Sequence, residues 1–143
     1  KNLRNILNSP AGKLIDGIVV GRSDLTKSYG YGKEYVDSPE IQSIVLDILK
    51  TAKEYGLDTL LGGNISTKSV VFIKKLYDDG MLNYIETRNV ICKLNDANVI
   101  SVSDLVQSMI LFEAAWLDYK ASKYESYSRE YSERAADIKN RIQ

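Results

Sequence analysis

The chain has 143 residues, of which 44% are hydrophobic and 27% charged, an ordinary composition for one globular domain. Nineteen basic and nineteen acidic residues cancel, so no charge excess indicates a nucleic-acid or anionic-membrane partner. The apolar runs fall far short of the ~20 residues of a membrane-spanning helix, and no signal peptide is visible. There is no histidine, so the chain offers no imidazole base or metal ligand. The single Cys92 cannot form an internal disulfide, which favours a reducing cytoplasm with Cys92 in a buried strand.

The first predicted unit is a strand followed by a helix. Residues 1–7 have the spacing of a helix already under way, and with no initial methionine we expect a piece of a longer protein. Residues 14–20 are aliphatic and rich in β-branched side chains, which predicts a buried strand. A helix should begin at Pro39 with Ser38 as its N-cap and end at Gly56.

The next two units repeat this plan. Residues 57–61 form the second predicted strand, and a glycine-rich turn leads to a helix capped by Ser66 that stops near Gly80. Residues 82–92 form the third, and a helix begins near Ser101 with a capping box. The alternation predicts an α/β fold with a parallel sheet, whose ligands bind at the carboxyl ends of the strands. A flavodoxin-like domain needs about five strands and ranks last, because only three are predicted.

The C-terminal stretch from residue 103 to 143 contains neither proline nor glycine. Apolar residues between 105 and 117 recur on a broad helical face, which indicates burial on two sides. Beyond them a tyrosine-rich series at spacings of three and four resembles a weak coiled-coil seam: Tyr124, Tyr127, Tyr131, Ala135, Ile138 and Ile142. One continuous helix would be roughly 60 Å long at ~1.5 Å per residue. It either packs back on its own domain or forms an oligomerisation arm.

Asp24 is the strongest candidate for chemistry. It follows a strand end and the glycine at position 21, and a carboxylate there could hold Mg²⁺ or Mn²⁺. The backbone N–H groups of residues 21–24 could meet a ligand's carboxylate or phosphate. Alternatively, Asp24 caps a short helix that starts at that residue.

Two further stretches could line a site. The turn Gly62-Gly63-Asn64 could approach a phosphate or carboxylate closely, although paired glycines in such a turn also occur for steric reasons alone. Alternation within the third strand places Glu86 and Arg88 on one face. A buried pair of this kind must be mutually satisfied, so it is either structural or adjacent to a substrate.

Residues 16–30, Asp-Gly-Ile-Val-Val-Gly-Arg-Ser-Asp-Leu-Thr-Lys-Ser-Tyr-Gly, resemble the motif of the HpcH/HpaI aldolase and citrate lyase β-subunit family. Ser38-Pro39-Glu40 and the turn at Gly62 support the resemblance, which covers about residues 1–118. It implies strands six to eight of a (β/α)8 TIM barrel, about three βα units, followed by a helical association arm at 119–143.

The resemblance also implies a function, that of a divalent-metal-dependent carbon–carbon lyase or aldolase acting on a pyruvate-like keto acid or an acyl-thioester. Asp24 would bind Mg²⁺, Mn²⁺ or another divalent metal, and the substrate-binding residues would be Gly21, Arg22, Ser23, Asp24, Gly62 and Gly63. Arg22 stands where many aldolases carry proline. The second carboxylate ligand and an essential arginine would lie upstream of residue 1, so this chain alone would lack the complete site.

The alternative function is a non-catalytic assembly module with a degenerate aldolase-like barrel. Three strands alone would expose two unpaired sheet edges and an open apolar face, which invite another chain. We therefore expect either a homo-oligomer or pairing with the missing N-terminal half, and no stable monomer.

Overall fold

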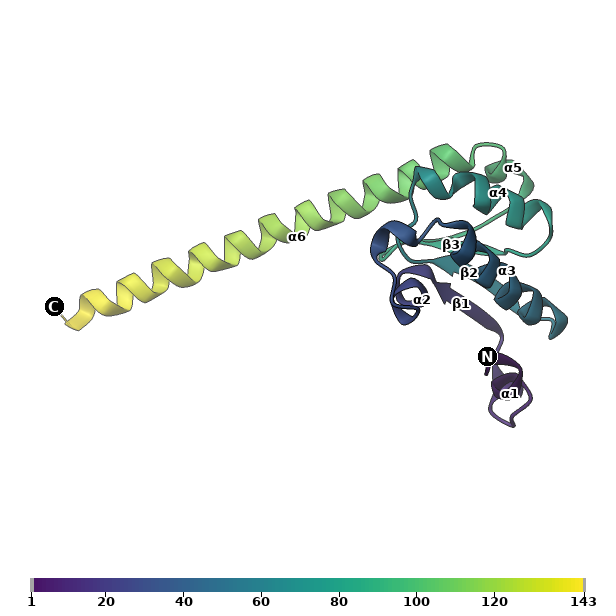
Figure 1. Ribbon diagram of the computed structural model, residues 1–143. Helices are drawn as coiled ribbons and strands as arrows, with labels where there is room; N and C mark the ends of the chain where they lie inside the picture. Colours follow the sequence, from purple (N-terminus) through teal and green to yellow (C-terminus); the bar gives the residue numbers. More distant parts are fainter. Residues whose placement is uncertain (1, 143) are drawn as a thin grey trace.

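A computed structural model describes residues 2–142 of the chain (Figure 1). Its strands are β1 (Gly17–Gly21), β2 (Asp58–Gly62), β3 (Tyr84–Glu86) and β4 (Ile91–Lys93). Its α-helices are α1 (Leu3–Leu7), α2 (Arg22–Ser28), α3 (Pro39–Glu54), α4 (Val70–Asp78), α5 (Asp96–Val99) and α6 (Val102–Lys139). Short 3₁₀ turns are η1 (Gly12–Leu14), η2 (Lys33–Tyr35), η3 (Thr67–Ser69) and η4 (Asn140–Ile142). No helix within these residues is long and apolar enough to cross a membrane.

The four strands form one open sheet in the order β1-β2-β3-β4. β1 pairs in parallel with β2, and β2 with β3, but β3 and β4 are antiparallel. The prediction of three βα units of a TIM barrel is therefore wrong. The predicted third strand over 82–92 is a hairpin: the polar run that follows β3 turns the chain, and the Thr87 N–H donates to the Val90 carbonyl at 2.9 Å. Arg88 consequently lies in the turn and not beside Glu86 on a strand face.

The predicted start of a helix at Pro39 and its end before Gly56 are confirmed. The Ser38 hydroxyl accepts a hydrogen bond from the Ile41 N–H at the start of α3, with Pro39 at the first helical position. Gly56 follows α3 with a φ of 70°, which L residues rarely adopt. Ser101 precedes α6 without a side-chain cap, so the capping box expected there is wrong. Among the described residues such boxes occur at Ser66 and at Asn95.

The core lies between one face of the sheet and helices α3, α4 and the first turns of α6 (Figure 1). Val20, Leu61 and Ile85 are in register on neighbouring strands and point into it. Ile41, Val45 and Leu49 meet them from α3 and are fully buried, as expected for positions four residues apart on one helical face.

The opposite face of the sheet is open. Side chains alternate along each strand, so Val19, Leu60 and Tyr84 share this face. Val19 is 57% exposed and Ile91 on the edge strand 62%. Cys92 lies half-buried on β4, and partial burial raises the pKa of its thiol. The expected open apolar face and unpaired edges are thus present, with four strands in place of three.

Helix α6 is one continuous helix that leaves the rest of the chain (Figure 1). Its buried residues are Val102, Val106 and Met109, which pack on the core. Phe112 and Trp116 are 54% and 39% exposed, so the predicted burial of this face on two sides is wrong. We call residues 2–109 the body and residues 110–139 the arm.

Candidate functional site

A cleft of about 570 Å³ opens at the carboxyl ends of β1, β2 and β3. Gly21, Gly62 and Glu86 are the last residues of these strands, and Gly21 is paired with Gly62. Residues from the strand ends, the β3–β4 turn and α6 line the cleft: Gly21, Ser23, Asp24, Lys33, Gly63, Asn64, Ile65, Glu86, Thr87, Arg88, Ile110 and Glu113. Parallel strands deliver loop side chains to one edge of a sheet, which is why this rim collects polar groups.

Asp24 reaches the cleft because α2 begins immediately after β1. Gly21 is the N-cap of α2 and makes no side-chain cap, and Asp24 is the third helical residue. The suggestion that Asp24 caps a helix beginning at that residue is therefore wrong. Its carboxylate lies over the end of β1, with Oδ2 3.7 Å from the position that a Cβ on Gly21 would take.

The glycine at the end of β2 leaves room for the side chain of Glu86. A Cβ on Gly62 would overlap the side chain of Glu86, which lies over this position. Because Gly21 and Gly62 are in register, Asp24 and Glu86 both cover glycine positions at the same end of the sheet. Both carboxylates line the cleft.

Gly63 is constrained more tightly. Its φ of +79° lies in the left-handed region, and a Cβ there would sit 2.5 Å from the backbone nitrogens of both Arg22 and Ser23. The turn after β2 therefore packs directly on the start of α2. Asn64, the next residue, also has a positive φ, of 55°, a conformation that asparagine tolerates better than most residues.

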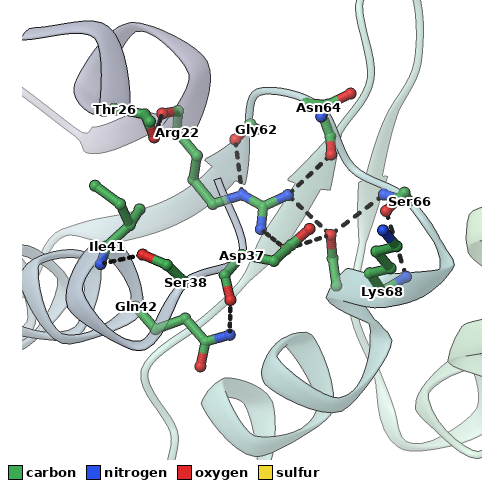
Figure 2. A network of polar contacts seen from close by, with 11 residues as sticks. Arg22, Thr26, Asp37, Ser38, Ile41, Gln42, Gly62, Asn64, Ser66 and Lys68 are labelled. Carbon is green, nitrogen blue, oxygen red and sulfur yellow. Dashed lines mark hydrogen bonds and ion pairs between the residues drawn. The ribbon is translucent and has the colours of Figure 1, made fainter. Parts of the chain in front are cut away.

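Arg22 is the centre of a buried polar network that joins the start of α2 to the loop after β2 and to Asp37 (Figure 2). Its guanidinium donates to Asp37 Oδ1 at 2.5 Å, to Ser69 Oγ at 2.9 Å and to the Asn64 carbonyl at 3.2 Å. The Ser69 hydroxyl in turn donates to Asp37 Oδ1 at 3.0 Å. Burial lowers the pKa of Arg22, and the Asp37 carboxylate opposes this by favouring the charged form.

The network places Arg22 beneath the rim, with its side chain 0% exposed. It holds the start of α2 against the loop between β2 and α4, so it positions Ser23 and Asp24 without lining the cleft. Of the six predicted site residues, Gly21, Ser23, Asp24 and Gly63 line the cleft, while Gly62 and Arg22 support it. Ligand binding by any of them stays a prediction.

Several lining residues escaped the sequence analysis. Asn64 is not among them, since it was proposed together with the paired glycines, and it lines the cleft. Lys33 lies in a short 3₁₀ turn and Glu113 on a helix far along the chain, and neither carries a local signal. They reach the cleft only through tertiary packing.

The cleft has mixed charge. Asp24, Glu86 and Glu113 contribute carboxylates, and Lys33 and Arg88 contribute cations. The Thr87 hydroxyl oxygen is buried and has no hydrogen-bond partner among residues 2–142, so it is free to bond a ligand group.

The side chains of the cleft fit a cation that is held partly by the protein and partly by a bound substrate better than a cation enclosed by protein ligands alone. Across the described residues no group of three or more acidic, cysteine or histidine side chains could hold a metal ion. Mg²⁺, however, binds through one or two carboxylates, keeping several waters and taking other oxygens from its substrate. Asp24, with Glu86 beside the same cleft, provides that smaller set.

Comparison of the chain with protein-family models, with curated proteins and with solved structures finds no match.

Proposed function

We propose that the cleft binds a small keto acid or acyl-thioester together with a divalent cation at Asp24, as part of a carbon–carbon lyase or aldolase. The observation that carries this proposal is the convergence of Ser23 and Asp24 from β1 with Gly63 and Asn64 from β2 on one cleft. The motif at residues 16–30 supports the same substrate class.

Each side of the cleft has a distinct part in binding. A bound divalent cation would supply Lewis acidity toward a carbonyl oxygen of the ligand. Asp24 would hold the cation, and Lys33 and Arg88 would attract the ligand's carboxylate. Gly63 leaves the backbone close enough to line the pocket, while the Arg22 network fixes the loop that carries Asp24.

Titration with Mn²⁺, with and without pyruvate, tests the proposal in wild type, Asp24→Asn and the control Asp58→Asn. Asp58 is exposed at the opposite end of β2. We expect pyruvate to strengthen Mn²⁺ binding and Asp24→Asn to weaken it at least tenfold, with Asp58→Asn unchanged. Equal binding by all three proteins would contradict the role of Asp24.

A second candidate function, assembly without catalysis, is favoured by a separate observation. The arm projects from the body with most of its large apolar side chains exposed, including Leu111 at 68% and Leu117 at 54%. Exposed apolar surface on this scale marks association sites in proteins. Sedimentation of the purified chain over a range of concentrations tests this function directly, and a monomer throughout would contradict it.

A further inference from the structure

The arm carries a seven-residue repeat of large side chains. Five positions recur at this interval, and all five are exposed, by 38%, 54%, 63%, 69% and 50% in chain order: Ile110, Leu117, Tyr124, Tyr131 and Ile138. Four small residues lie between them, each four residues after one large residue and three before the next: Ala114, Ala121, Ser128 and Ala135. Alternating spacings of four and three are the heptad signature of a coiled coil.

We call these nine residues the seam. It extends over about 40 Å of helix at ~1.5 Å per residue, beyond the last buried residue of α6, Met109. Phe112, Trp116 and Tyr119 lie away from it, while Tyr127 borders it beside Ser128. The rings of Tyr119 and Tyr127 flank the Lys123 ammonium, with centroids 6.0 and 5.8 Å away.

We propose that the partner of this seam is a second copy of the same arm, paired in an antiparallel coiled coil. The proposal deepens the assembly function and does not depend on ligand binding at the cleft. The first argument is packing. A parallel pair would stack small residues on small ones and tyrosines on tyrosines, whereas an antiparallel pair sets each large residue opposite a small one, for example Tyr131 opposite Ala121.

The second argument is charge. Residues that flank the seam near the body include Glu113 and Asp118, and those near the far end include Arg134 and Lys139. A parallel pair would set Glu113 beside Asp118 and Arg134 beside Lys139, two like-charge contacts against the single favourable one of Lys120 with Glu125.

An antiparallel pair brings the acidic end of each arm beside the basic end of the other. With the arms fully overlapped, Ala114 faces Ile138, Glu113 lies on the same side of the seam as Arg134 of the second copy, and Asp118 lies on the same side as its Lys139. The two bodies then stand at opposite ends of the coiled coil, and the pairing meets the edge of each cleft at Ile110 and Glu113, which line it.

Analytical ultracentrifugation of wild type, Tyr124→Glu and Tyr119→Glu tests the seam. Both tyrosines are exposed in the single chain, by 63% and 54%, but only Tyr124 lies on the seam. We expect a wild-type dimer that Tyr124→Glu weakens at least tenfold and Tyr119→Glu leaves unchanged. A wild-type monomer would overturn both the seam and the assembly function. A dimer that Tyr124→Glu leaves intact would overturn the seam alone and direct attention to the open sheet face.

Cross-linking tests the orientation. Ala114→Cys and Ile138→Cys are made separately in a Cys92→Ala background and mixed under mild oxidation. The antiparallel pair predicts disulfides between the two variants and none within either one. Self-linked products of each variant alone would contradict this orientation and indicate a parallel pair.

Discussion

The body and the arm of this chain use the same residue types for opposite purposes. In the body, Leu49 and Leu61 are fully buried between the sheet and its helices. In the arm, Leu117 is 54% exposed, on the helix that extends away from the body (Figure 1). The comparison shows that periodic apolar residues predict a helical face that tends to be buried. Only the three-dimensional arrangement shows whether the same chain buries it.

The largest difference in stability effect between the body and the arm should appear when a leucine in each is replaced by alanine. Leu49→Ala removes a side chain with 0% exposure from the core. We expect a loss of about 2–5 kcal/mol in the free energy of unfolding. Urea denaturation followed by circular dichroism measures it. The matched variant Leu117→Ala should leave the stability of the body unchanged, and an equal loss in both variants would mean that the arm folds back on the body.

Breaking the Arg22 network should cause the next largest loss in the free energy of unfolding. Asp37→Ala leaves the guanidinium buried without its carboxylate partner. We expect a loss of about 3 kcal/mol, at the low end for buried pairs because the Asp37 side chain is 21% exposed. The control Asp47→Ala, on the exposed face of α3, should stay within about 0.5 kcal/mol of wild type. Stability equal to the control would mean that the network contributes nothing to the body.

Alanine substitutions at two glycines with positive φ, Gly80 and Gly63, separate the effect of backbone strain on stability from that of close packing. Gly80→Ala introduces a Cβ with nothing within 4 Å, so only the conformation is penalised, by about 1 kcal/mol. Gly63→Ala adds overlap with the start of α2 and should cost more. Thermal denaturation of both variants checks the order. Gly63→Ala should in addition weaken Mn²⁺ binding, which Gly80→Ala should leave unchanged.

The smallest effect concerns pH and the start of α3. The pKa of the Glu40 carboxyl is lowered, first by its own backbone N–H and then by the Ser38 hydroxyl. Because the folded pKa lies below the unfolded one, the ionised form stabilises the fold above the unfolded pKa. This stabilisation is lost as the pH falls through the lower folded pKa. Glu40→Gln should therefore reduce stability slightly near pH 7 and match wild type under strongly acidic conditions, as chemical denaturation at several pH values can show. A loss independent of pH would contradict the assignment.

The cleft shows where prediction from sequence succeeded. The glycine at position 21 and Asp24 directly after a strand placed a carboxylate at the strand end, and the structure puts it at the cleft. The paired glycines located the neighbouring loop by the same reasoning, since both features lie within a few residues of a strand end. Lys33 and Glu113 could not be found in this way, because nothing near them in the chain marks their approach to that loop.

The sequence by itself determined the local features: the Ser38 cap, the glycine helix ends, the two parallel strands with their crossover helix, and the heptad spacing of the arm. These depend on backbone conformation and on residues three or four apart. Tertiary structure alone decided that residues 82–93 turn back as a hairpin and that Arg22 is buried under the rim. It also left α6 uncovered beyond Met109, the last buried residue of that helix. Those outcomes depend on which distant groups meet, since strand pairing and burial are set by contacts between segments far apart in the chain.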